Sequence, residues 1–150
     1  MLFSEIIGHD DIKQKLIQSV KESRVAHAQL FLGPDGTGKL ALAIAYAQYI
    51  NCTNKKDNDS CGECPSCRKY NALAHPDTHF IFPTVTNKTV KKEPESDLFL
   101  SEWRDYLISC KGYASLSSWY DTLGIENKQG VINVRDAANI MKKLSLKSYE

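Results

Sequence analysis

The sequence has no apolar run long enough to cross a membrane, and it has almost no excess of charge. A membrane-spanning helix needs about 20 consecutive apolar residues, and no segment of the chain approaches that length. Lysine and arginine number 19 against 18 aspartate and glutamate, which leaves a net charge of +1 in 150 residues. This balance gives no electrostatic argument for strong binding to nucleic acid.

The first residues also lack the features of a secretory signal. Met1-Leu-Phe-Ser-Glu5 contains neither a basic segment nor a long apolar stretch. We therefore expect a soluble, cytoplasmic protein with no membrane partner. A chain of 150 residues can bury a real core, most simply as one domain.

The most informative motif present is Gly33-Pro-Asp-Gly-Thr-Gly-Lys39, which fits the G-x-x-x-x-G-K spacing of a phosphate-binding loop. Glycines allow a turn whose successive backbone N–H groups form a concave nest for phosphate oxygens. A helix that begins near Lys39 would direct its positive end at the anion. The predicted nucleotide-binding residues are Gly33, Pro34, Asp35, Gly36, Thr37, Gly38, Lys39 and Leu40.

The elements around this motif match a phosphate loop. The apolar run 28–32 indicates a buried parallel strand, and residues 40–50 are apolar nearly all round, which indicates a buried helix. The order strand, loop, helix is the one that the motif requires. The alternative is an ordinary turn that joins a strand to a helix.

The residue after the loop lysine departs from the motif. Leu40 stands where a Ser or Thr hydroxyl normally helps to hold Mg²⁺, and its hydrocarbon side chain cannot ligate a hard cation. We expect the loop to hold the phosphates of ATP or ADP, with slow or absent hydrolysis and no catalytic residues.

Four cysteines form a second constellation, with the spacing C-x8-C-x2-C-x2-C. Cys52, Cys61, Cys64 and Cys67 can supply the four thiolates of a closed, structural Zn²⁺ site. Residues 53–60 are polar and cannot fold by apolar burial, so metal binding would supply the local folding energy. Two disulfides or four free thiols are the alternatives. His75 and His79 lie nearby, but four thiols already close the coordination shell.

Hydrophobic periodicity divides the chain into alternating helices and strands. The predicted helices cover residues 9–23, about 39–51, 68–74, 98–111 and 132–144, and the predicted strands cover 28–32 and 78–82. Residues 84–97 are polar and suggest a mobile loop, and 112–130 show little periodicity. The alternation predicts an α/β fold, a P-loop NTPase of three αβα layers with a parallel sheet.

No apolar run that ends in acidic residues follows residue 83, although a phosphate-loop ATPase needs one to organise magnesium and water. Two strands also make a poor sheet by themselves. We therefore expect an N-terminal piece of a longer protein; a small self-contained domain is the alternative.

Several blocks resemble the clamp-loader subunits of bacterial DNA polymerase III, the AAA+ proteins delta-prime and gamma/tau. These blocks are Phe3–His9, Ala26–Pro34, the four-cysteine insertion, His75–Asp77 and Val131–Asp136. The resemblance implies an AAA+ domain that carries a zinc-binding insertion at about 52–67 and a variable polar insertion at about 84–130. It also implies that Walker B, the lid and the collar domains lie beyond residue 150.

The resemblance implies a role in loading the sliding clamp on primed DNA, within the DNA-directed DNA polymerase III holoenzyme. The partners would be the gamma/tau and delta subunits and, through the complex, the clamp and DNA. Leu40 favours the delta-prime type, whose ATP site is often degenerate. The alternatives are an active gamma/tau-type ATPase, a small-molecule kinase, or a zinc-ribbon module that binds nucleic acid.

Overall fold

The computed structural model describes residues 1–125 and 129–145, and its regular structure there is entirely helical. Residues 126–128 of the predicted insertion, and 146–150, lie outside the described part. The elements in chain order are η1 (Phe3–Glu5), α1 (Asp10–Lys21), α2 (Lys39–Asn51), α3 (Pro65–Asn71), η2 (Ser96–Phe99), α4 (Leu100–Ser109), α5 (Leu116–Thr122) and α6 (Val134–Leu144).

Helix α2 is the most deeply buried element. Its N-cap is Gly38, which adopts a left-handed conformation (φ 77°), and its C-cap is Cys52. Seven of its side chains are buried, which agrees with the prediction of a helix that is apolar on nearly all sides. Helix α1 packs along it, and the hydroxyl groups of Ser19 and Tyr46 hydrogen-bond across the interface at 2.7 Å.

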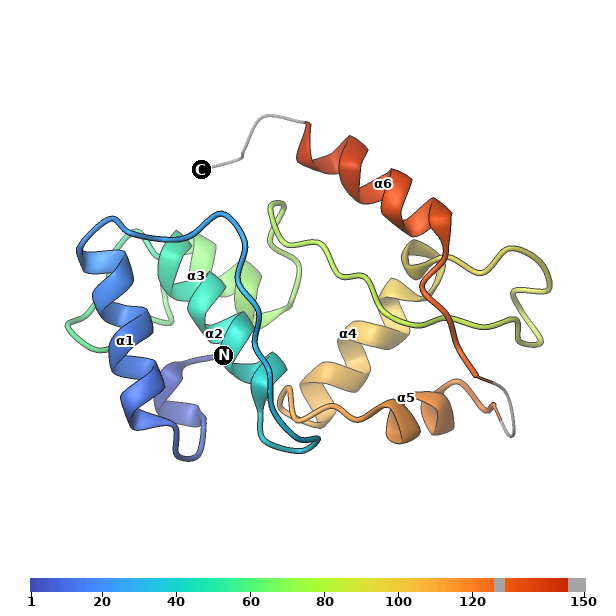
Figure 1. Ribbon diagram of the computed structural model, residues 1–150, viewed down its shortest axis with the longest axis horizontal. Helices are drawn as coiled ribbons and strands as arrows, with labels where there is room; N and C mark the ends of the chain where they lie inside the picture. The colour runs from blue at the N-terminus through green and yellow to red at the C-terminus, as the bar shows by residue number, and fades with distance from the viewer. Residues whose placement is uncertain (126–128, 146–150) are drawn as a thin grey trace.

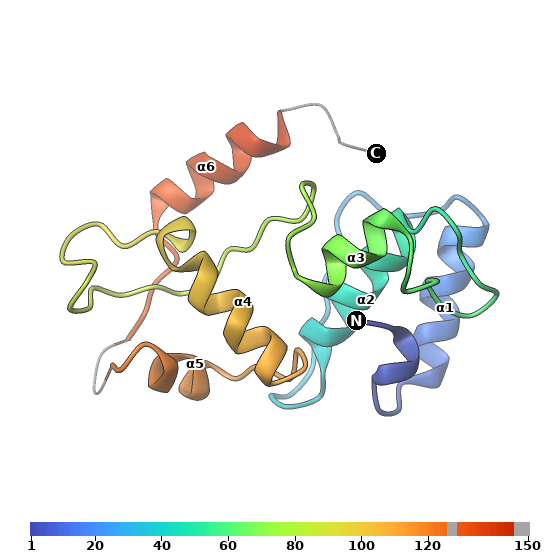
Figure 2. The same cartoon turned by 180° about the vertical axis from the view of Figure 1, so that it is seen from behind.

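The helices form two groups around α2. Helices α1, α2 and α3 lie together at one side of the molecule, and α4, α5 and α6 lie at the other (Figures 1 and 2). In the first group, η1, α1 and α2 share a core cluster that includes Phe3, Ile17 and Tyr49. Ile44 of α2 belongs instead to the cluster of the second group, so α2 contributes to both cores.

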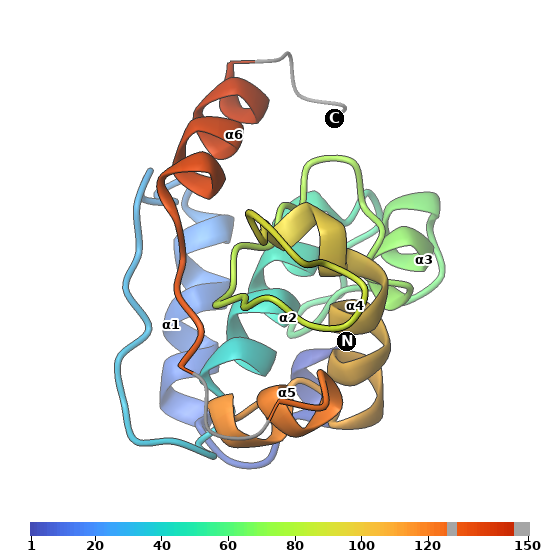
Figure 3. The ribbon, with the colours of Figure 1, turned by 90° about the vertical axis from the view of Figure 1, so that its right-hand side faces the viewer.

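The predicted parallel sheet is not formed by the residues that the structure describes. Residues 28–32, expected to be a buried strand, are irregular, and Leu30 and Leu32 are 84% and 87% exposed. The segment runs along the outside of the molecule beside α1 (Figure 3). Residues 78–82 are irregular too. In the described ranges the only β-type pairing is an isolated antiparallel bridge between Thr84 and Val131.

The region 84–130 packs more tightly than its polar composition suggests. Its Trp103 stacks on Phe82 of the preceding segment, with ring centroids 4.2 Å apart. Trp119 is fully buried against both rings and donates from Nε1 to Pro83 O at 2.9 Å. Trp119 belongs to α5, a helix in a segment where the sequence indicated none. Both tryptophans are core residues.

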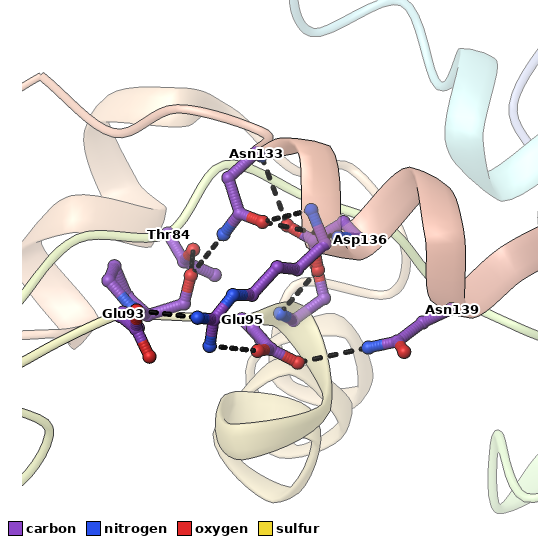
Figure 4. A network of polar contacts seen from close by, with 9 residues as sticks. Thr84, Glu93, Glu95, Asn133, Asp136 and Asn139 are labelled. Atoms are coloured by element: carbon purple, nitrogen blue, oxygen red, sulfur yellow. Dashed lines mark hydrogen bonds and ion pairs between the residues drawn. The ribbon is translucent and has the colours of Figure 1, made fainter.

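Helix α6 is fastened by polar contacts to residues 93–97 (Figure 4). The buried Asp136 carboxylate accepts hydrogen bonds from the backbone N–H groups of Ser96 (2.8 Å) and Asn133 (3.2 Å). The Arg135 guanidinium lies 2.5 Å from Glu93 and 3.4 Å from Glu95. The opposite face of α6 is apolar and exposed: Met141 and Leu144 are 69% and 68% accessible.

Replacing Asp136 with Ala should destabilise the protein, because the change leaves two N–H groups without their acceptor. We expect the free energy of unfolding to fall by about 2 to 4 kcal/mol. Urea denaturation measures this. Asp121→Ala, on the exposed surface of α5, is the matched control and should change stability by less than about 0.5 kcal/mol. Equal midpoints for the two variants would contradict the role assigned to Asp136.

Candidate metal centre and phosphate loop

The structure brings the four predicted cysteines together at the junction of α2 and α3. Cys52 is the C-cap of α2, Cys64 is the N-cap of α3, and Cys67 lies in the first turn of α3. Pro65 occupies the first helical position, where its missing N–H costs nothing. The four Sγ atoms all lie within 4.8 Å of one another, so they can hold a metal ion.

Backbone N–H groups point at the sulfur atoms. The N–H of Cys61 lies 3.3 Å from the Sγ of Cys52, the N–H of Cys64 lies 3.3 Å from the Sγ of Cys61, and the N–H of Cys67 lies 3.4 Å from the Sγ of Cys64. Such donors stabilise thiolates, which are the form that binds metals. All five cysteines of the chain are free of disulfide bonds, so the disulfide alternative is not formed.

The pKa is lowered for two of the four thiols and raised for the other two. The backbone N–H groups of Glu63 and Cys64 lower the pKa of Cys61. Burial opposes ionisation of Cys64, but hydrogen bonds from Cys67 and Thr53 outweigh it and lower that pKa to about 5. Burial raises the pKa of Cys52, and burial with the hydrogen bond to Cys64 raises that of Cys67 to about 12. Without a cation, four close sulfurs cannot all ionise.

The cysteine module is tied to the rest of the protein by polar contacts. The Asp59 carboxylate accepts from the backbone N–H groups of Phe3 (3.0 Å) and Ser4 (2.9 Å), and Gln48 of α2 donates to Ser60 Oγ at 3.2 Å. Residues 53–58 between the ligands are all exposed. The module therefore has no apolar interior of its own.

His75 does not belong to the cysteine cluster. It is buried, stacks on Tyr70 with centroids 4.5 Å apart, and contacts Ser66 Oγ through Nε2 at 3.2 Å. Its Nδ1 accepts from the N–H of Asp77. His79 is exposed. Cys110 is partly buried against the core cluster of α4, as expected for a small apolar residue.

The predicted phosphate loop forms the turn that leads into α2. Gly36 and Gly38 adopt positive φ angles of 76° and 77°, a conformation that residues with a Cβ atom rarely adopt. Lys39 Nζ donates to Pro34 O at 2.5 Å and lies 3.8 Å from the Asp35 carboxylate. The Lys39 ammonium group is thus held by contacts within the loop itself.

Leu40 has a structural role at the position of the missing hydroxyl. Its partly buried side chain packs against the core cluster that contains Trp103 and Trp119. His9 is the N-cap of α1, and its Nε2 contacts Thr37 O at 2.7 Å. This contact joins the turn before α1 to the phosphate loop.

Two cavities lie against the loop. One, of about 350 Å³, is bounded by the loop and by residues 112–116, and Trp119 also lines it. The other, of about 380 Å³, lies between the loop, α1 and residues 29–32. Sequence reasoning missed Tyr113, whose hydroxyl accepts from the N–H of Ile7 at 3.0 Å. No local pattern could reveal a contact between residues 106 positions apart.

The chain thus combines a closed four-thiol cluster with a glycine-rich loop at the start of a buried helix. Residues 8–150 match the family model described as DNA polymerase III, delta subunit. The chain belongs to this family. In the described residues no helix has the length and apolarity that crossing a membrane requires.

Curated relatives match parts of the chain. It is 37% identical over 73 residues to DNA polymerase III subunit delta' of Pseudomonas aeruginosa, covering 49% of this chain and 22% of that protein. It is 33% identical over 66 residues to DNA polymerase III subunit tau of Bacillus subtilis, covering 44% and 12%. Protein STICHEL of Arabidopsis thaliana is 39% identical over 70 residues, covering 47% and 6%. No solved structure matches significantly.

Metal analysis of the purified chain tests the four-thiol cluster. We expect about one equivalent of bound metal, because four thiolates form a single closed site. Cys64→Ser should lose most of it and should lower the melting temperature, since the module has no apolar interior to replace the metal. Cys110→Ser is the matched control and should retain the full content. Equal metal in both variants would contradict the assignment.

Proposed function

We propose that this chain is part of a delta-prime-type clamp-loader subunit of DNA polymerase III, acting in DNA replication. The support is the family match over residues 8–150, together with relatives named delta', tau and gamma/tau. The partners would be the gamma/tau and delta subunits and, through the complex, the sliding clamp and primed DNA. This function places the protein in the cytoplasm.

The matched segments cover only 6% to 22% of the relatives described above. The proposed domain organisation is therefore that of a longer AAA+ protein. Residues 1–150 would be its N-terminal part, with the zinc-binding insertion at about 52–67 and the variable insertion at about 84–130. The irregular segments 28–32 and 78–82 would become strands of the parallel sheet in that larger domain, whose Walker B, lid and collar would come from other segments.

The metal of the proposed protein is Zn²⁺, in a structural role. Zinc–sulfur bonds of about 2.3 Å in a tetrahedron separate neighbouring sulfurs by about 3.8 Å. The Sγ atoms of Cys52 and Cys61 lie 3.6 Å apart, and those of Cys61 and Cys67 lie 3.8 Å apart. Bound zinc would neutralise the four thiolates and hold the module between α2 and α3. Four protein ligands leave no position open for catalysis.

The observation that carries the delta-prime assignment is Leu40 after an intact G-x-x-x-x-G-K. Gly33 to Lys39 would hold ATP or ADP through backbone N–H groups and the Lys39 ammonium. Leu40 uses its side chain in the core, so it offers no oxygen to Mg²⁺. Nucleotide would be bound in a passive role, with slow or absent hydrolysis by this subunit.

Nucleotide binding should be independent of magnesium. We expect ADP affinity, measured by calorimetry on the full-length chain, to be the same with Mg²⁺ and with EDTA, because no side chain grips the metal at position 40. Leu40→Thr should make binding at least threefold tighter in Mg²⁺ than in EDTA, since one hydrogen-bonding ligand contributes about 1 kcal/mol. Leu40→Val, isosteric with Thr, is the control and should show no such dependence.

The clamp-loader role is tested in the reconstituted complex. Omission of the subunit should abolish loading of the clamp on primed DNA. Lys39→Ala in this subunit should leave ATP turnover and loading within about twofold of the wild type, because the hydrolysing sites would lie in other subunits. Loss of turnover in that variant would instead favour the gamma/tau-type ATPase. Salt-dependent DNA binding by the isolated chain would favour the zinc-ribbon alternative.

A further inference from the structure

An aromatic side chain fills the space between the phosphate loop and the turn before α1. The ring of Tyr113 lies against Gly38, where an added Cβ atom would come within 2.9 Å of the tyrosine Cε1. The Tyr113 hydroxyl accepts a hydrogen bond from the backbone N–H of Ile7 at 3.0 Å. One side chain therefore covers the last glycine of the loop and occupies a backbone donor beside it.

The neighbouring cavity has the features of a ligand site. It holds about 350 Å³ and is bounded by loop residues on one side and by Tyr113, Trp103 and Trp119 on the other. Trp103 is 7% exposed, and among the described residues its Nε1 has no hydrogen-bond partner. This nitrogen atom is itself buried, so Trp103 lines the cavity with its apolar ring.

A nucleobase could make the same two contacts that Tyr113 makes here, one through a flat aromatic ring and one through an acceptor atom. It is a flat aromatic ring whose edge carries acceptor atoms suited to a backbone N–H. A nucleotide with its phosphates in the loop needs an apolar slot for the base within the reach of one ribose. The slot against Gly38, beside the N–H of Ile7, meets this requirement.

Resting on the proposed nucleotide site, we infer that the Tyr113 ring occupies the base subsite as an internal ligand. A purine nucleotide then binds with full affinity only when the ring has moved out. The apparent affinity is reduced by the fraction of molecules in which the subsite is open. Pro34 O is a second internal ligand, because it accepts the Lys39 hydrogen bond that a phosphate oxygen would otherwise accept.

The surrounding chain allows the ring to leave without unfolding. Gly112 approaches α2 so closely that a Cβ there would lie 2.9 Å from Ala41 Cα, so the backbone before Tyr113 is fixed. The Tyr113 side chain itself is only partly buried. Rotation about its side-chain bonds can therefore open the subsite while α2 and α4 stay in place.

Calorimetry on the full-length chain with two probes tests the inference. ADP carries a base, and tripolyphosphate occupies only the phosphate loop. Tyr113→Ala should bind ADP about tenfold more tightly than the wild type, because the competing ring is gone. Its affinity for tripolyphosphate should be unchanged. Tyr113→Phe keeps the ring and loses only the bond to Ile7, so its ADP affinity should rise about threefold.

Tyr120 offers a matched control. Its ring packs over Gly130, and its hydroxyl accepts the N–H of that glycine at 3.1 Å, away from the phosphate loop. Tyr120→Ala should leave ADP affinity unchanged. Circular dichroism of each variant identifies any that fails to fold, in which case Tyr113→Phe alone decides the question.

The outcomes separate the inference from the proposed function. If the wild type binds ADP in a Lys39-dependent manner and neither Tyr113 variant binds it more tightly, the inference is overturned and the nucleotide site stands. An equal gain for tripolyphosphate also overturns it, because the ring would then act on the loop and not on the base. If no variant binds either probe, the inference and the nucleotide-binding part of the proposed function both fail.

Discussion

The burial of helix α2 is the constraint on which both candidate sites depend. The N-cap of this helix is the last glycine of the phosphate loop, and its C-cap is Cys52, the first residue of the four-thiol cluster. Tyr49 and Tyr46 fix the helix against the first core cluster, and Ile44 fixes it against the second. Because the helix cannot shift without opening one of these cores, the loop and the cluster are held at opposite ends of one rigid element.

The two candidate sites at the ends of α2 differ in what would bind there and in what stabilises them. The N-terminal end carries unpaired N–H groups and a partial positive charge, which favour an anion. At the C-terminal end the chain turns away into a module that has no apolar interior, and sulfur ligands take the place of a core. The proposed anion site would therefore be formed by the backbone of a well-packed element, whereas the proposed metal site would need its ion to become a stable structure.

Helices could be predicted from this sequence more fully than strands, for a physical reason. A helix satisfies its hydrogen bonds within one segment, so local periodicity identified α1, α2, α4 and α6 with small errors at their ends. A strand needs a neighbour, and the apolar run 28–32 finds none among the described residues and stays exposed. Helix α5 was missed because it is short and depends on one buried residue, Trp119, that is held by tertiary contacts.

Among the residues of the candidate sites, those with a local sequence pattern could likewise be predicted and those placed by tertiary contacts could not. The cysteines could be found from spacing, because four thiolates need only short turns between them to converge. The glycines and Lys39 could be found because the loop is local. Tyr113 could not, because it reaches Gly38 and Ile7 from a distant segment, whose preceding residue Gly112 approaches Ala41 of α2 closely. Residues that line a site from a distant segment carry no periodic or spacing signal.

Leu40 and Tyr113 are the two side chains that relate the phosphate loop to the cores of the protein. Leu40 packs against the cluster of α4 and α5 at the position where the loop motif has a metal-binding hydroxyl, and Tyr113, which packs against the first core cluster, lies beside the same loop. A hydroxyl at position 40 would need water and a cation close to Trp103 and Trp119, where burying unpaired polar groups is costly. In the proposed nucleotide site, the hydrophobic core of the second helix group and a magnesium-dependent ATP site would therefore compete for the same space. In this chain Leu40 packs against that core, while Gly38 serves as the left-handed N-cap at which α2 begins.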